Sequence, residues 1–173
     1  MKGIMRGKCF KFGDNIDTDM IIPVKYCNTY DMAELGKHCM AGYEENFAKN
    51  ISTGDFLVAG SNFGCGSSRE NAPLAIKGCG IQAVIASSFA RIFLRNAINV
   101  GLLIFESEEA SQKISEGDQL EIIKEKGLIR NLTRVETYSS SPLPEFITTI
   151  IEEGGLVGYV RKKLKGKQED CLS

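Results

Sequence analysis

Hydrophobic and polar positions follow two different periods along the chain, and their order predicts an α/β fold. Residues 4–13 alternate between apolar and polar side chains, which is typical of a strand. Short apolar runs of the kind that form buried strands lie at 55–60, 81–87 and 102–105. A helix that starts near Asn71 and another over 88–101 separate these runs, so we expect parallel strands joined by helical crossovers.

The remaining segments have weaker patterns. The spacing of apolar residues over 31–40 predicts a helix, for which Asp31 is a good N-cap. The expected elements elsewhere are a polar turn and a short strand broken at Pro23 over 14–26, a helix over 107–117, a hairpin over 118–138, and one or two helices over 144–164.

Composition narrows the class of protein. The 173 residues are 43% hydrophobic, which is enough for one domain spanning 1–173. A net charge of −1 argues against nucleic-acid binding. No apolar run is long enough to cross a membrane, and the N-terminus has no signal-peptide pattern, so we expect a cytoplasmic protein.

The six cysteines, at 9, 27, 39, 65, 79 and 171, include no C-x-x-C pair. This spacing argues against a zinc ribbon or a self-contained iron–sulfur site, so we expect no metal in this chain and reduced thiols. His38 is the only histidine, so the usual general base is almost absent.

The stretch "GSNFGCGSSREN" at 60–71 carries the strongest chemical signal. Ser67 and Glu70 fit a helix-capping box, but a cap at Ser67 would place Pro73 inside the helix, where proline is disfavoured. A cap at Asn71 places Pro73 in the first turn and leaves the serine hydroxyls free.

A glycine-rich loop between a strand and a helix also suits an anion, and Arg69 offers a two-pronged donor for a carboxylate. Neither the phosphate-binding nor the dinucleotide-binding glycine motif is present. A serine could act as a base beside Arg69 and the helix end, whereas a hydrolase triad has no histidine nearby.

Three segments together resemble the aconitase swivelling-domain family in its free-standing small-subunit form. They are "GKCFKFGDNIDTDMIIP" (7–23), "FGCGSSRENAPLAIKG" (63–78) and "VIASSFARIFLRNAINVGLLIF" (84–105), and the resemblance is strong over 3–106. It implies a three-layer β/β/α fold, which residues 107–173 complete.

The resemblance also implies roles for individual residues. Ser67 would be the base that removes a proton beside a carboxylate, and Ser68 and Arg69 would bind a substrate carboxylate. Asp19 would help to order the site, with a turn-forming aspartate as the alternative. Arg91 would support the loop from behind, with a surface ion pair as the alternative.

The same resemblance implies a two-chain hydro-lyase whose large subunit holds a [4Fe-4S] cluster through three cysteines. This chain would hold no cofactor and would be inactive alone. In isolation it would be a monomer or a homo-oligomer. Apolar surface around 26–35 and 61–70 would face the large subunit.

Two features bear on the substrate. The family loop usually continues Arg-Glu-His-Ala, whereas Asn71 here carries no charge, which predicts an altered pH response or a preserved helix cap. In the family, the loop after Tyr26 sorts substrates. Its residues here are Lys25, Tyr26, Cys27, Asn28 and Thr29, with no arginine to hold an extra carboxylate.

We therefore expect isomerisation of 2-isopropylmalate to 3-isopropylmalate by dehydration and rehydration. The alternatives are a related hydro-lyase for citramalate, dimethylmalate or homocitrate, and a non-catalytic module that binds a carboxylate or a protein.

Overall fold

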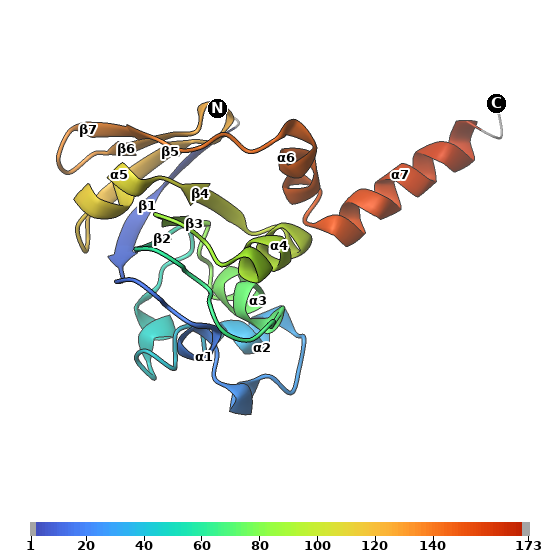
Figure 1. Cartoon of the computed structure of the whole chain (residues 1–173). Coiled ribbons are helices and arrows are strands. Elements are labelled where there is room, and N and C mark those ends of the chain that lie inside the picture. Colours follow the sequence, from blue (N-terminus) through green and yellow to red (C-terminus); the bar gives the residue numbers. More distant parts are fainter. Residues whose placement is uncertain (1–2, 171–173) are drawn as a thin grey trace.

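The computed structural model describes residues 3–170, with side chains described as far as residue 165. Its strands form one mixed sheet in the order β4-β3-β2-β1-β5-β6-β7 (Figure 1). The strands are β1 (Ile4–Lys11), β2 (Phe56–Ala59), β3 (Ala83–Ala86), β4 (Leu103–Glu106), β5 (Gln119–Ile123), β6 (Leu128–Asn131) and β7 (Glu136–Ser139).

The helices lie between and after these strands. They are α1 (Thr18–Ile21), α2 (Met32–Gly36), α3 (Asn71–Gly78), α4 (Arg91–Val100), α5 (Glu108–Lys113), α6 (Glu145–Glu152) and α7 (Leu156–Asp170), with 3₁₀ turns at Val24–Tyr26, Phe47–Asn50 and Lys124–Lys126. Among the residues described, no helix combines the length and hydrophobicity needed to span a bilayer.

Strand β1 belongs to both halves of the sheet. Its residues 4–8 pair antiparallel with β5, while residues 9–11 pair parallel with β2. The two halves enclose one core, in which Phe56 and Val58 of β2 meet Leu120 and Ile122 of β5. The antiparallel half is therefore one layer, the parallel half the second, and the expected β/β part of the fold is confirmed.

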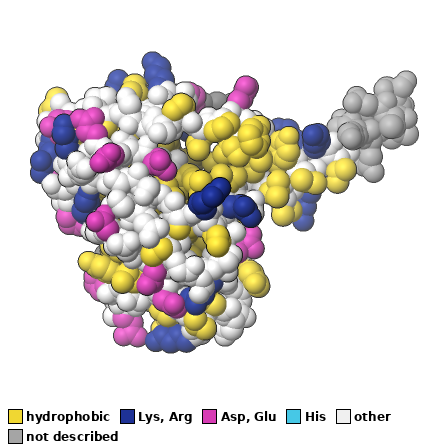
Figure 2. Space-filling model, in the orientation of Figure 1, with side chains coloured by type: hydrophobic (Ala, Val, Ile, Leu, Met, Phe, Trp, Pro, Cys, Tyr) yellow, Lys and Arg dark blue, Asp and Glu magenta, His cyan; other side chains and the backbone are white. Residues whose placement is uncertain are grey.

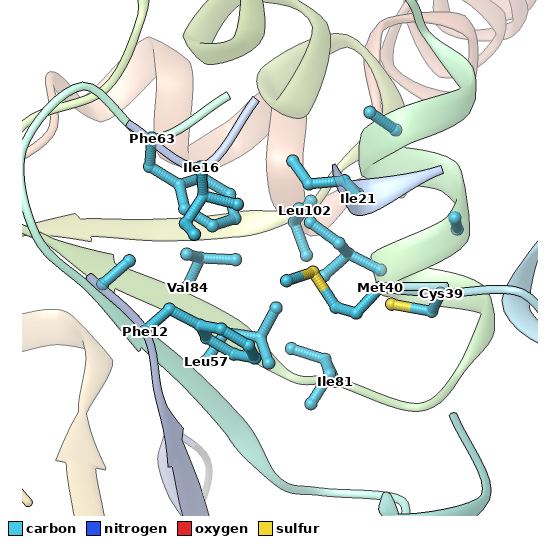
Figure 3. Packing of buried hydrophobic residues seen from close by; sticks show 14 of the residues in the cluster. Phe12, Ile16, Ile21, Cys39, Met40, Leu57, Phe63, Ile81, Val84 and Leu102 are labelled. Carbon is cyan, nitrogen blue, oxygen red and sulfur yellow. The ribbon is translucent and has the colours of Figure 1, made fainter. Parts of the chain in front are cut away.

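The opposite face of the parallel half carries the helical layer. Because side chains alternate along a strand, Leu57 and Ala59 point to this face while Phe56 and Val58 point to the other. A second core lies here, and Figure 3 shows Leu57, Val84 and Leu102 packed near Phe63 and Met40. The arrangement confirms the expected three-layer β/β/α fold.

Helix α7 extends away from the rest of the molecule (Figure 1). Figure 2 shows hydrophobic side chains gathered where α6 meets α7. The exposed members on these two helices are Phe146, Leu156, Val157, Val160 and Leu164.

Two expectations about local structure are wrong. Residues 14–26 contain α1 and a 3₁₀ turn instead of a short strand, because the Asp17 carboxylate caps α1 by accepting a 2.8 Å hydrogen bond from the backbone N–H of Met20. Residues 118–138 form three antiparallel strands instead of one hairpin. The amide oxygen of Asn131 accepts hydrogen bonds from the N–H groups of Thr133 and Arg134, both 3.1 Å, and so makes the second turn.

Other expectations are confirmed. The Asp31 side chain caps α2 by accepting from the N–H of Glu34, although the helix ends at Gly36. Helix α4 ends at Gly101, whose φ of 72° is left-handed and favours glycine. Cys171, one of the cysteines expected to be reduced, lies outside the described residues.

Candidate functional site

The loop 60–71 leaves the carboxyl end of β2 and leads into α3. Its backbone is held by the segment before α1: the N–H of Thr18 donates to the Cys65 carbonyl at 2.9 Å, and the N–H of Gly64 donates to the Ile16 carbonyl at 2.7 Å. Gly64 has a φ of 79°, and a Cβ there would overlap the Phe93 ring. The loop therefore has a defined path, although most of its side chains face solvent.

Ser67 and Ser68 are exposed at the tip of this loop. The Thr18 hydroxyl donates a 3.2 Å hydrogen bond to the Ser67 carbonyl oxygen, which fixes the backbone and leaves the Ser67 hydroxyl free to face a ligand. Helix α3 begins at Asn71, so Ser67 does not cap it and Pro73 lies in the first turn, as expected. The expected cap at Asn71 is wrong, because Glu70 occupies the cap position.

Arg69 is paired with Asp19. The Nη1 atom of Arg69 donates to Oδ1 of Asp19 at 2.7 Å, and Nη2 donates to Oδ2 at 3.5 Å. The Arg69 side chain is 17% exposed, and that of Asp19 is 61% exposed. The hydrogen bond that Arg69 donates to Asp19 raises the pKa of Arg69, so the guanidinium is held charged next to the two serines in the chain. Its remaining N–H groups can meet a carboxylate.

Three consecutive residues therefore serve one site. Asp17 caps α1, Thr18 holds the backbone at Ser67, and Asp19 holds the Arg69 side chain. Sequence reasoning selected Asp19 and missed Asp17 and Thr18. The spacing from Asp17 to Met20, just before the apolar pair at 21–22, is the N-cap signal that would have found the helix.

The loop 25–29 lies beside this centre. The Asn71 amide, 6% exposed, donates a 2.8 Å hydrogen bond from Nδ2 to the carbonyl oxygen of Thr29. Burial raises the pKa of the Cys27 thiol, and the nearby Arg69 charge partly opposes that rise. Asn71 thus joins α3 and Arg69 to the loop, a contact that sequence reasoning did not find.

The start of this loop is ordered by aromatic contacts. The Tyr26 ring stacks on His38 with centroids 3.7 Å apart, and the Lys25 ammonium lies 4.8 Å from the Tyr26 centroid. A hollow of about 340 Å³ opens here, lined by Lys25, Tyr26, Asn28, Thr29, Glu34 and His38. Four of the five expected substrate-selecting residues therefore share one depression.

Arg91 is less closely connected to the loop. It is the exposed first residue of α4, and its side chain makes no ion pair or hydrogen bond with the described residues. The neighbouring backbone does touch the loop, because the N–H of Ala90 donates to the Phe63 carbonyl at 2.9 Å. Any direct support from Arg91 would need a different side-chain position.

The apolar surface expected for a partner is only partly present. Val24, Tyr30 and Met32 are 61%, 71% and 41% exposed around the first expected stretch. Within 61–70 the expectation is wrong, since Phe63 is fully buried and the exposed side chains are polar. The glycines and serines let the loop turn outward while Phe63 packs in the core.

No group of three or more His, Cys, Asp or Glu side chains within residues 3–165 is placed to hold a metal ion. At the candidate site, Ser67, Ser68 and Arg69 offer two hydroxyls and one guanidinium, groups that can donate hydrogen bonds to an anion.

Comparison with known proteins adds to this geometry. Residues 53–110 match the family model for the aconitase C-terminal domain. The 3-isopropylmalate dehydratase small subunit of Clostridium beijerinckii is 55% identical over 92% of this chain and 99% of that protein. The protein of the same name from Moorella thermoacetica is 56% identical over 94% of this chain and 98% of its own length.

A solved structure agrees with these relatives. The crystal structure of 3-isopropylmalate dehydratase (leuD) from Methanocaldococcus jannaschii superposes with a TM-score of 0.92 at 48% identity, covering 96% of this chain and 99% of that one. The match in sequence extends over nearly the whole chain, and the fold agrees with it. The chain therefore belongs to the family of 3-isopropylmalate dehydratase small subunits.

Proposed function

We propose that this chain is the small subunit of a two-chain hydro-lyase that isomerises 2-isopropylmalate to 3-isopropylmalate in leucine biosynthesis. The observation that carries the proposal is the Arg69–Asp19 pair beside the exposed Ser67 and Ser68, in a chain of which 92% aligns with a protein of that name.

Arg69 binds a carboxylate of the substrate in this proposal. A guanidinium matches a carboxylate with two parallel hydrogen bonds, and Asp19 fixes the plane of the fork before substrate arrives. Because the charge is already oriented, it stabilises negative charge that develops on the carboxylate when the neighbouring proton leaves. Ser68 adds a hydroxyl donor at the same end of the ligand.

Ser67 is the proposed base, which takes the proton from the carbon beside that carboxylate. A serine hydroxyl is a poor base unless positive charge stabilises its deprotonated form. Two sources lie next to it here, namely the Arg69 guanidinium and the amino-terminal end of α3. The Thr18 hydrogen bond to the Ser67 carbonyl holds the backbone from which this hydroxyl projects.

This chain supplies only part of the site in the proposal. A [4Fe-4S] cluster in the large subunit would supply a Lewis acid for the substrate hydroxyl group. The exposed Val24, Tyr30 and Met32 lie next to the loop 25–29 and suit contact with that subunit. Without it, the chain has no activity and is free to self-associate.

The loop 25–29 is proposed to select the substrate. Its side chains near the hollow are uncharged apart from Lys25, and the Lys25 ammonium lies over the Tyr26 ring. An alkyl substituent can lie against the neutral Asn28 and Thr29 side chains, whereas an additional carboxylate has no arginine partner in the loop. This favours 2-isopropylmalate, followed by citramalate and dimethylmalate, over homocitrate.

The test is an assay of the chain co-expressed with its large subunit and purified without oxygen. Formation of the unsaturated acid is followed by ultraviolet absorbance from each of the four acids. Wild type is compared with Ser67→Ala and with Ser61→Ala, an exposed serine of the same loop away from Arg69. We expect turnover of 2-isopropylmalate that Ser67→Ala lowers by about 10²-fold or more while Ser61→Ala keeps it.

Three results would oppose the proposal. Turnover by the chain alone would exclude the two-chain mechanism. Equal activity of the two serine variants would exclude Ser67 as the base. Preference for another of the four acids would keep the reaction class and replace the substrate.

A further inference from the structure

Two cysteines outside the proposed site lie together where α2 and α3 meet. These helices approach so closely that a Cβ on Gly36 would overlap the backbone of Gly78. Cys39 follows the end of α2 by three residues, and Cys79 is the C-cap of α3. Both pack on the same core, where the two thiols lie close enough for each to shift the pKa of the other, and the Cys79 thiol donates a 3.0 Å hydrogen bond to the carbonyl oxygen of Ile76.

The two thiols differ in access to solvent. Cys39 is fully buried (Figure 3), whereas Cys79 is half-buried and lines an open groove of about 620 Å³ together with Gly36, Gly78 and His38. Cys79 is therefore the thiol of the pair that borders the groove, whereas Cys39 is closed off from solvent.

We propose that Cys79 and Cys39 form a reversible oxidation site, in which hydrogen peroxide oxidises Cys79 and Cys39 then closes a disulfide with it. The Cys79 thiol loses its proton, the thiolate attacks one peroxide oxygen, and the O–O bond breaks to give a sulfenic acid and hydroxide, which takes up the released proton and leaves as water. The Cys39 sulfur attacks the sulfenic sulfur, the S–O bond breaks, and the Cys39 proton leaves with the oxygen as a second water. Two thiols and one peroxide give one disulfide and two waters.

Electrostatics agree with this division of roles. The neighbouring Cys39 thiol lowers the pKa of Cys79, burial partly opposes this shift, and backbone N–H groups add to the lowering. Burial raises the pKa of Cys39 well above its usual value. Burial also raises the pKa of the other described thiols, in the case of Cys9 to about 11. Cys79 is thus the thiol best prepared to react first.

In this proposal, Cys39 makes the oxidation of Cys79 reversible. A sulfenic acid with no partner is oxidised further to a sulfinic acid, which most cells cannot reduce. With Cys39 in contact, the first oxidation product is diverted to a disulfide that a thiol reductant can open again.

The test treats the full chain with hydrogen peroxide, removes the excess with catalase, blocks free thiols and maps the peptides by mass spectrometry. We expect a Cys39–Cys79 linked peptide lighter by two hydrogen atoms, which disappears after dithiothreitol. We also expect iodoacetamide to modify Cys79 about tenfold faster than Cys9 before oxidation.

Variants separate the two roles. Cys39→Ser should leave a sulfenic acid on Cys79 that dimedone traps, and Cys79→Ser should leave Cys39 unoxidised. Cys9→Ser and Cys171→Ser should both keep the linked peptide. Circular dichroism checks folding, and the wild-type peptide map decides the question even if a variant fails to fold. Absence of the linked peptide in wild type, or dimedone labelling of Cys39 in Cys79→Ser, would overturn the proposal.

Discussion

The Nδ2 atom of Asn71 lies 2.8 Å from the carbonyl oxygen of Thr29 and donates a hydrogen bond to it. This bond connects the first turn of α3, two residues after Arg69, to the end of the loop 25–29. The proposed carboxylate-binding residue, Arg69, and the proposed substrate-selecting loop therefore meet at the start of one helix.

Asn71→Ala should loosen the loop while leaving Arg69 in place. We expect KM for 2-isopropylmalate to rise several-fold with a smaller change in kcat, together with a loss of about 1–3 kcal/mol in the free energy of unfolding from the unpaired carbonyl. Asn71→Asp keeps the shape but places an acceptor against the Thr29 carbonyl, so its KM should rise at least as much. An unchanged KM in Asn71→Asp would rule out this positioning role.

Asp19→Asn should weaken the orientation of Arg69. The neutral amide keeps at most one hydrogen bond to the guanidinium, so we expect kcat/KM to fall by about 10–100-fold in the complex with the large subunit. Because Asp19 is 61% exposed, the same change should alter the free energy of unfolding by less than about 1 kcal/mol. A large loss of stability with unaltered kcat/KM would mean that the pair is structural.

Asn28→Arg tests the loop directly. Asn28 is exposed and lines the 340 Å³ hollow, so an arginine there would offer a carboxylate partner without disturbing the core. We expect the ratio of kcat/KM for homocitrate to that for 2-isopropylmalate to rise by at least tenfold. Asn50→Arg, at the end of a 3₁₀ turn away from this hollow, is the control. No change in the ratio would reject a selecting role for the loop.

The lowered pKa of Glu121 predicts that the free energy of unfolding depends on pH. On adjacent strands, Arg6 donates to its carboxylate at 2.7 Å and Arg130 at 3.0 Å, and these hydrogen bonds hold the pKa of Glu121 below its usual value. A lowered pKa in the folded state contributes stability above the unfolded pKa, and this contribution is lost as pH falls through the folded pKa.

Glu121→Gln should therefore be less stable than wild type near neutral pH, and the difference should shrink as the pH is lowered through the acid range. Urea unfolding at a series of pH values measures it. Glu44→Gln is the control, because Glu44 is exposed and makes no ion pair within the described residues. A constant difference at all pH values would contradict the assignment.

Gly36→Ala should destabilise the contact between α2 and α3. The new Cβ would meet the Gly78 backbone, which cannot move without shifting α3, so we expect a loss of about 1–3 kcal/mol in the free energy of unfolding. Gly13→Ala is the matched control, since a Cβ there has no atom within 4 Å. Chemical denaturation of both variants gives the comparison, and equal stabilities would show that the helices adjust.

The sequence by itself determined the parallel half of the fold. Local rules were sufficient there, because the apolar runs of β2, β3 and β4 are short, continuous and separated by helices with clear ends such as Gly101. The same local reasoning placed Pro73 in the first turn of α3 and left Ser67 free. Linked motifs around Ser67, Arg69 and Asp19 also identified the family.

Tertiary structure decided what depends on contacts between distant segments. The sequence predicted a polar turn and then a short strand broken at Pro23 over 14–26, yet Asp17 caps α1 there and Thr18 bonds to the loop that holds Ser67. The bonds from Arg69 to Asp19 and from Asn71 to Thr29 join residues 50 and 42 positions apart. Periodicity indicates which face of an element is apolar, but it carries no information on which polar groups form hydrogen bonds between distant segments. Those hydrogen bonds position the residues of the candidate site.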